Sequence, residues 1–309
     1  FESVAGIGES EELKNNAQLW VQIIRNQQAA SKPYRLYLKT GYIYDDNVVL
    51  EPADQDIVSN ESDSALMLYF SGKYDLVKDR RVTSGIGYSH YQSLYQDLDE
   101  YNLVGSMGNV YVNYQLNESW TLGVKYLPTY YWVDSESYLM QHRFNPSVLW
   151  MIDNFNAVDF SYSYYRNNYF TDNFRDGHAN KTSADYSHSF SEIDGYAFCG
   201  IGYEIYSASA KDEDFSELRT LLGISCDIFD HTRITVYGKY YDKSYDHKDS
   251  SYDIKRDDSR YYVSASITQN IWKQWLSVSA EYNYTKNNSN IADYDYERNA
   301  VLLSVSVDL

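Results

Sequence analysis

The sequence predicts an all-β fold: a transmembrane, antiparallel, up-and-down β-barrel of about 14 strands, preceded by a short amphipathic α-helix. Three observations lead to this prediction. Apolar residues take every second position in segments of 11 to 14 residues, which is about twice the usual strand length. The connections between these segments alternate between short and long. No stretch approaches the ~18 consecutive apolar residues of a spanning helix, so a membrane crossing would have to use strands.

Residues 1–33 differ from the rest and are expected to form a periplasmic helical segment. Ser10 is placed to cap a helix that ends at Lys32-Pro33. Its apolar residues recur at helical spacing: Leu13, Ala17, Trp20 and Ile24. One such helix cannot form a core alone, so it plugs the barrel, lies beneath it or joins a larger periplasmic domain. The chain begins at Phe1 without the basic and apolar regions of a signal peptide, so we expect a mature or trimmed form.

Residues 34–309 are expected to form the outer-membrane barrel. The predicted strands are 34–44, 63–74, 79–91, 103–115, 118–131, 139–152, 155–166, 180–190, 195–207, 215–228, 233–243, 258–270, 274–286 and 296–309. Every even-numbered strand is followed by a tight turn and every odd-numbered strand by a long loop, which is typical of outer-membrane barrels. Pro146 falls inside a strand that has no free edge, so we expect a bulge or a shifted register there.

One face of each strand is apolar and the other is polar. In residues 215–243, for example, Ile224, Cys226 and Ile228 alternate with Ser225 and Asp227. A soluble sandwich would bury such a face between shorter strands, so lipid explains it better, and lipid requires the sheet to close. Tyrosines on the apolar face near strand ends are expected at the headgroup level: Tyr42, Tyr44, Tyr126, Tyr164, Tyr240 and Tyr282.

The net charge of −18 argues against a nucleic-acid partner and lies almost entirely in the long loops. The acids predicted in extracellular loops include Asp45, Asp46, Asp54, Asp56, Asp212, Glu213 and Asp214. Two interpretations fit these acids. They either keep exposed loops soluble, or they act on charged neighbours, by a calcium-bridged contact with lipopolysaccharide phosphates or by repelling anionic solutes.

Strand parity places a set of bases on the lumen-facing wall: Arg35, Lys39, Lys73, Arg81, Lys125, Arg143, Arg219, Arg233, Lys239 and Arg260. Fewer acids share this face: Asp159, Asp185, Glu204, Glu217 and Glu281. Such a wall either attracts anions or an acidic polypeptide, or its charges pair across strands and only stabilise the wall.

Cys199 and Cys226 lie on neighbouring strands with outward parity. They form either a cross-strand disulfide or two free thiols that face lipid. The six histidines are scattered, and the sequence contains no Gly-x-Ser-x-Gly, no His-x-x-x-His and no glycine-rich phosphate loop. We therefore expect no enzyme activity, no cofactor and no metal site.

The segment "GYIYDDNVVLEP" (41–52) and the helix "AQLWVQIIRNQQ" (17–28) resemble the start of the barrel and the last preceding helix of the surface lipoprotein assembly modifier family. In that family periplasmic tetratricopeptide helices precede a barrel of fourteen strands. Its first strand runs into a Tyr-Asp-x-Asn-like stretch, here Tyr44, Asp45, Asp46 and Asn47. The resemblance implies delivery of lipoproteins to the cell surface.

The expected function is therefore a translocation or export pore in the bacterial outer membrane, with both termini in the periplasm. The expected partners are membrane lipid, lipopolysaccharide, a translocated polypeptide client and a periplasmic helical-repeat domain. Two alternatives stay open: a monomeric diffusion porin with an anion-leaning lumen, and a structural or adhesive barrel with a plugged lumen.

Overall fold

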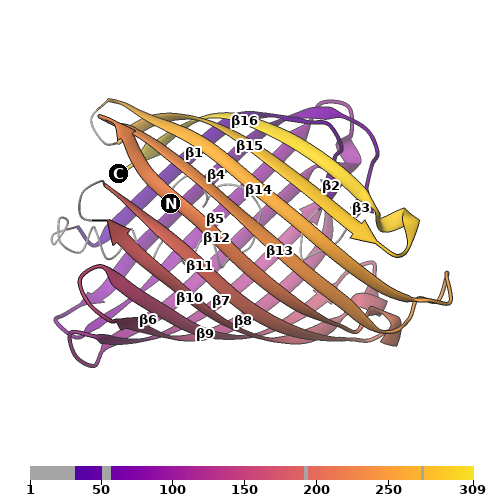
Figure 1. The fold of residues 1–309 in the computed structure, drawn as a ribbon, viewed down its shortest axis with the longest axis horizontal. Helices are drawn as coiled ribbons and strands as arrows, with labels where there is room; N and C mark the ends of the chain where they lie inside the picture. The colour runs from indigo at the N-terminus through magenta and orange to yellow at the C-terminus, as the bar shows by residue number, and fades with distance from the viewer. Residues whose placement is uncertain (1–31, 51–56, 191–193, 273–274) are drawn as a thin grey trace.

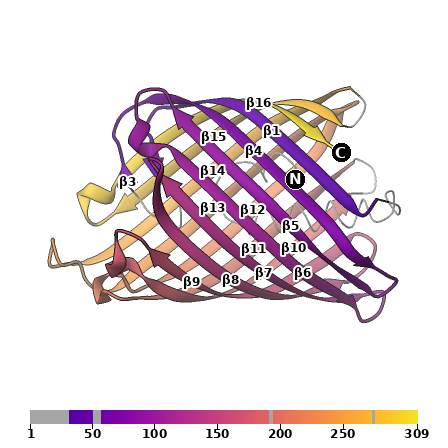
Figure 2. The same ribbon diagram turned by 180° about the vertical axis from the view of Figure 1, so that it is seen from behind.

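The computed structural model describes residues 32–50, 57–190, 194–272 and 275–309. Fourteen antiparallel strands form a closed barrel in which each strand pairs with its neighbours in sequence and β16 pairs with β1 (Figures 1 and 2). The strands are β1 (Tyr34–Asp45), β4 (Asp63–Lys78), β5 (Val82–Tyr95), β6 (Leu103–Gln115), β7 (Trp120–Val133), β8 (Glu136–Met151), β9 (Asn156–Tyr169), β10 (Gly177–Phe190), β11 (Gly195–Ala208), β12 (Phe215–Phe229), β13 (Thr232–Lys248), β14 (Lys255–Trp272), β15 (Leu276–Ser289) and β16 (Tyr296–Asp308). The predicted barrel is confirmed. The helix predicted within residues 1–33 lies outside the described residues.

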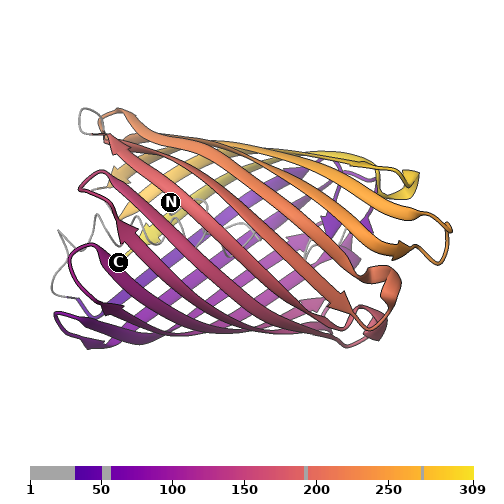
Figure 3. The ribbon, with the colours of Figure 1, turned by 60° about the horizontal axis from the view of Figure 1, so that its bottom comes forward.

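All fourteen predicted strands are present, but most are longer than predicted. They contain 12 to 18 residues, from β1 to β14, and they tilt strongly against the barrel axis (Figure 3). The extra residues are mainly polar ones at the strand ends, such as Ser244 to Lys248 in β13. Hydrogen bonding continues there although the apolar alternation has ended, so sequence periodicity does not detect these ends.

The two ends of the barrel differ in their connections. The turn rim carries the short turns at 79–81, 116–119, 152–155 and 230–231, and the connections from β10 to β11 and from β14 to β15. It also carries the start of β1 and the C-terminus, because Leu36 and Leu309 exchange backbone hydrogen bonds there (Figure 1). The loop rim carries the connections 46–62, 96–102, 134–135, 170–176, 209–214, 249–254 and 290–295.

One connection on the loop rim contradicts the predicted alternation of short and long breaks. β7 and β8 are joined by only Asp134 and Ser135, both with positive φ (48° and 64°). Two residues with positive φ are typical of a type I′ hairpin turn, whose twist suits two antiparallel strands. The prediction of a longer loop was wrong because β7 continues to Val133, past its predicted end at 131, and β8 begins at Glu136 and not at residue 139.

The outer face of the wall is apolar and exposed. Leu66, Leu222 and Leu303 are 63%, 70% and 57% exposed, respectively. Near the turn rim, Trp120 and Trp150 stack on each other with ring centroids 5.3 Å apart. Exposed apolar and aromatic side chains of this kind occur on many strands around the closed sheet. Such a surface is typical of the part of a barrel that contacts the hydrocarbon of a membrane.

Pro146 lies in β8 without a bulge, so the expectation of an irregular strand was wrong. The register is continuous on both sides of it, with Phe144 opposite Tyr164 and Ser147 opposite Ser161. Proline has no N–H, and this leaves the carbonyl of Tyr162 on β9 without its ladder partner. The side chain of Asn145 donates to that carbonyl instead, at 3.0 Å. The side-chain amide of Asn145 therefore replaces the missing backbone N–H of Pro146, and the sheet stays regular.

The first loop, 46–62, contains the small hairpin of β2 (Val49–Leu50) and β3 (Ile57–Val58) at the loop rim (Figure 1). Val48 is fully buried, and Val49 and Leu50 are each 6% exposed. Leu50 belongs to an apolar cluster with Tyr138, Leu139 and Tyr169 of β8 and β9. Since β8 is four strands away from β4 along the sheet, this loop crosses the mouth of the barrel to reach another part of the wall.

Candidate functional site: the inner wall and its seam

The inner face of the barrel carries nine of the ten predicted wall bases. These are Arg35, Lys39, Lys73, Lys125, Arg143, Arg219, Arg233, Lys239 and Arg260, whose positions alternate with outward-facing neighbours. Lys39, Arg219 and Lys239 are almost completely buried. Arg81 does not belong to the wall, because β4 extends to Lys78 and Arg81 is exposed in the following turn. The five predicted inner acids are all on this face and all buried.

Acids and bases of the inner wall form ion pairs across strands. Glu281 on β15 lies 3.7 Å from Lys39 on β1, Asp185 on β10 lies 3.6 Å from Arg219 on β12, and Glu204 on β11 lies 3.0 Å from Lys181 on β10. Charges buried in a wall of low polarity need such partners, since each unpaired charge would be costly. Pairing, one of the two interpretations of the wall bases, therefore applies to this part of the wall.

Other inner bases lie over aromatic rings. The guanidinium of Arg143 lies 4.7 Å from the centroid of the Tyr165 ring, and that of Arg260 lies 5.2 Å from the Tyr241 centroid. The ammonium of Lys239 lies 5.0 Å from the Tyr262 centroid. A ring stabilises a cation without neutralising it, so these contacts preserve positive charge on the inner face.

Four further bases of the inner face were missed in the sequence: Lys181, Lys243, Arg256 and Arg298. Strand parity was sufficient to find Lys181, Lys243 and Arg298, which all lie within predicted strands. Arg256 was assigned to a loop because the predicted strand began only at residue 258. In the structure β14 begins three residues earlier, at Lys255. In the structure Arg256 pairs with Asp258 at 2.6 Å and lies 3.4 Å from the Tyr294 ring centroid.

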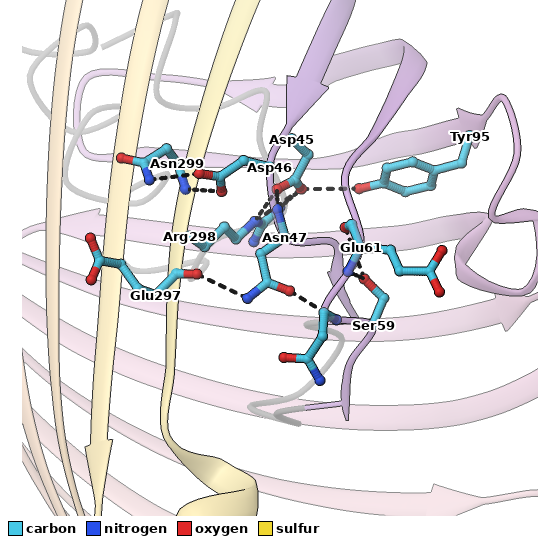
Figure 4. A network of polar contacts seen from close by, with 10 residues as sticks. Asp45, Asp46, Asn47, Ser59, Glu61, Tyr95, Glu297, Arg298 and Asn299 are labelled. Carbon is cyan, nitrogen blue, oxygen red and sulfur yellow. Dashed lines mark hydrogen bonds and ion pairs between the residues drawn. The ribbon is translucent and has the colours of Figure 1, made fainter.

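A polar network closes the seam between β1 and β16 at the loop rim (Figure 4). The carboxylate of Asp45 is fully buried and accepts hydrogen bonds from Arg298, with Nε at 3.0 and 2.9 Å and a terminal nitrogen at 2.7 Å. Tyr95 of β5 donates to the same carboxylate at 3.4 Å. A bidentate pair of this kind has fixed geometry as well as strength, so it holds the first and last strands together.

The next two residues continue this network. Asp46 accepts hydrogen bonds from the backbone and side-chain nitrogens of Asn299, at 2.6 and 2.7 Å. The side chain of Asn47 donates to the Glu297 carbonyl at 2.9 Å and accepts from the backbone of Asn60 at 3.0 Å. The Asp-Asp-Asn stretch thus ties the last strand to the first strand and to the end of the first loop (Figure 4).

The predicted acidic loop residues have different surroundings. Asp45 is not a loop residue: it is the last residue of β1 and is buried. Asp54 and Asp56 lie outside the described residues. Asp212 and Glu213 lie in the 3-10 turn Lys211–Glu213. Asp214 follows this turn and is buried, because its carboxylate accepts a hydrogen bond from the backbone of Ala208 at 2.6 Å and pairs with Lys211 at 3.0 Å.

The arrangement at Asp214 recurs in two other loops. The 3-10 turns Asp99–Tyr101 and Asn173–Arg175 are followed by Asn102 and Asp176. Their side chains accept hydrogen bonds, each of 2.6 Å, from the backbone of Tyr95 and Tyr169 at the end of the preceding strand. Some polar residues of the loop rim thus terminate strands, which is a structural role that neither interpretation of the acidic loops included.

Two of the outer loops are also linked by a hydrogen bond. Tyr252, in the β13–β14 loop, donates to Asp293 in the β15–β16 loop. This hydrogen bond to a carboxylate raises the pKa of Tyr252 to about 12. The two loops therefore support each other at the rim.

The two cysteines face outward, as predicted, but they do not face each other. Cys199 is opposite Leu222 and Cys226 is opposite Gly195. Both are free thiols. Of the two alternatives, the structure therefore has the free thiols. The register of β11 and β12 centres their hairpin between residues 210 and 211, whereas a pairing of the two cysteines requires a centre between 212 and 213.

Within the described ranges, no helix is long and apolar enough to cross a membrane. Among the same residues, no group of three or more His, Cys, Asp and Glu side chains is arranged to hold a metal ion.

Several solved outer-membrane proteins share this fold. The channel DcaP of Acinetobacter baumannii is 10% identical over 89% of this chain and 96% of its own, with a TM-score of 0.55. An anion-selective porin from Comamonas acidovorans is 9% identical over 89% and 98%, with a TM-score of 0.53. OmpT of Vibrio cholerae is 8% identical over 91% and 99%, with a TM-score of 0.51. At these identities the likeness shows the fold alone.

No curated protein matches the chain. The family model of the surface lipoprotein assembly modifiers, however, matches residues 35–308, which is the entire barrel from the second residue of β1 to the end of β16. This match agrees with the Tyr-Asp-Asp-Asn stretch at the end of β1 and with the outer-membrane fold. The chain belongs to the surface lipoprotein assembly modifier family of outer-membrane proteins.

Proposed function

We propose that this barrel is the outer-membrane pore through which a surface lipoprotein passes to the cell surface. Membership of the surface lipoprotein assembly modifier family carries this proposal. A closed wall with charged and hydroxyl side chains on its inner face suits the task, because it offers a polypeptide backbone the hydrogen-bonding surroundings that hydrocarbon lacks.

In this proposal the pore is closed until a client engages it. The first loop supports this, because Leu50 anchors it on β8 and β9 across the barrel mouth. The inner bases would contact acidic stretches of the client. Arg143 and Arg260 are the first candidates, because their rings leave them charged and neither residue is fully buried. We place the turn rim and both ends of the barrel domain in the periplasm, since short turns face that side in barrels of this class.

The direct test is display of a lipoprotein on a Gram-negative cell that produces this chain and a candidate client. We expect surface exposure, measured by antibody labelling of intact cells, to depend on the chain. The double variant R143Q/R260Q should reduce exposure, whereas K248Q, which changes an exposed residue paired with Asp253 at the loop rim, should not. Equal display with and without the chain would refute the proposal.

Conductance in planar bilayers separates this function from a diffusion porin. A closed barrel is expected from the purified chain, and replacing Leu50 with Ser should raise the open probability by releasing the first loop. A wide, stable and ungated pore in the unmodified protein would instead favour the porin. The helical segment expected at residues 1–33 must be present in these experiments, because its role stays a prediction.

A further inference from the structure

The outer face of the barrel carries one arginine that has no place in the ion pairs of the wall. In the described strands every other arginine faces inward, and only Arg166 of β9 faces outward. Arg166 is exposed and has no hydrogen bond or ion pair to any described residue, whereas Lys286, an outward base at the same rim, lies 3.8 Å from Glu297.

The strand register surrounds Arg166 with two histidines. His142 of β8 and His178 of β10 are both directly opposite Arg166 in the sheet. Side chains in such positions have Cβ atoms about 5 Å apart, so the three residues form one row across three strands. We call this row the basic row.

Each of the two histidines contacts a tyrosine. The Tyr126 hydroxyl lies 2.7 Å from Nδ1 of His142, and the two rings stack with centroids 6.1 Å apart. Tyr164 lies against His178 at 6.0 Å. Opposite His178 on β11 stands Ser207, which adds a hydroxyl at the end of the row. The row thus offers nitrogen and hydroxyl groups, which are the donors that bind a phosphate.

The height of the basic row places it at the edge of the hydrocarbon. Toward the turn rim, β9 presents Phe160, Tyr162 and Tyr164 outward, exposed by 45%, 38% and 41%. Toward the loop rim, β9 ends three residues beyond Arg166. Asp176, the carboxylate just before β10, is engaged by the backbone of Tyr169 and does not pair with Arg166. A cation at this level reaches the headgroups of the surrounding leaflet.

We propose that the basic row binds the phosphate of an anionic lipid headgroup in the leaflet at the loop rim. Arg166 supplies the fixed charge and a planar donor fork, and the histidines and Ser207 supply neighbouring donors. An arginine that lies opposite two histidines and has no carboxylate partner is consistent with an anion that comes from the membrane. The proposal is independent of lipoprotein export, because it concerns the outer face and not the lumen.

The test is a titration of the folded full-length chain in detergent with bisphosphorylated lipid A, followed by native mass spectrometry. We expect R166Q to lower the affinity about fivefold, which corresponds to about 1 kcal/mol for one basic group near an anionic headgroup. R166K should lose less, and K286Q, the matched outward base with its own acid, should bind like the unmodified chain. Heat-modifiable gel migration verifies that each variant is folded.

Two further arms identify the ligand. Dephosphorylated lipid A should bind the unmodified chain as weakly as bisphosphorylated lipid A binds R166Q. Excess inorganic phosphate should not displace lipid A. Equal binding by R166Q and the unmodified chain, equal binding of the two lipids, or displacement by free phosphate would each overturn the proposal.

Discussion

Replacing Asp45 with Ala should destabilise the barrel at the seam where the first and last strands meet. Asp45 is fully buried and accepts three hydrogen-bond contacts from Arg298. The substitution leaves the guanidinium of Arg298 in the wall without this carboxylate. The closure of the sheet at the loop rim would then depend on Asp46, Asn47 and the backbone ladder.

Removing one partner of a buried pair costs about 3 to 5 kcal/mol, because the other charge stays buried. The side chain of Arg298 is 16% exposed, so water compensates part of the loss and the lower end of this range applies. We therefore expect the free energy of unfolding to fall by about 3 kcal/mol, a factor of roughly a hundred in the unfolding equilibrium. Arg298→Ala should cost at least as much, because it leaves the fully buried carboxylate of Asp45 with only the more distant donors of Tyr95 and Asn47. The double variant should show a coupling of about 2 kcal/mol.

The measurement is equilibrium unfolding by urea in lipid vesicles, followed by the fluorescence of the six tryptophans. Asp45→Asn keeps the shape of the side chain and separates loss of charge from loss of packing. The control is Lys286→Ala, which removes an exposed pair on the outer face of the same rim and should cost less than about 1 kcal/mol. If Asp45→Ala and Arg298→Ala have additive effects, or if Asp45→Ala changes stability no more than the control, the seam network does not close the barrel.

Three further predictions concern the wall. Asn145→Ala should cost about 1 kcal/mol or more in the same urea assay, and less in a Pro146→Ala background, where a backbone N–H can take over the hydrogen bond to Tyr162 but not the one to Ser163. Gly223→Ala should cost about 1 to 3 kcal/mol through overpacking, since a Cβ there would lie 2.6 Å from Cβ of Tyr237, whereas Gly238→Ala, with its nearest atom at 3.5 Å, should be tolerated. The two cysteines should both react with a thiol reagent in the unfolded, non-reduced chain, and a single disulfide-linked species would contradict the register of β11 and β12.

Parity in the sequence was enough to place side chains on faces. Lys39, Arg219 and Lys239 were assigned to the inner wall from alternation alone, and all three are buried there. Alternation identifies the faces because successive side chains of a strand point to opposite sides of the sheet. Lipid favours apolar side chains on the outer side, and the interior favours polar ones. The family resemblance likewise came from a short stretch of residues, which the family model extends to the whole barrel.

Which residues of one face lie opposite each other on neighbouring strands depends on the exact strand register. The sequence did not determine this register. The cysteines show the reason: moving a hairpin centre by one residue moves each cross-strand partner by two, so a small error in the loop bounds separates two residues expected to be opposite. Asp45 shows the same limit, because a strand end that lacks apolar alternation reads as a loop. The first loop has no periodicity, and its course across the mouth follows only from the packing of Leu50.

The sequence by itself determined that the sheet must close, which face meets lipid and which face lines the interior, since these depend on local alternation. Only the tertiary structure decided which charges pair, how Asp45 and Arg298 hold the seam and where Arg166 lies beside two histidines. Those contacts join residues that are distant in the chain. They are determined jointly by the strand register and by the closure of the sheet into a barrel.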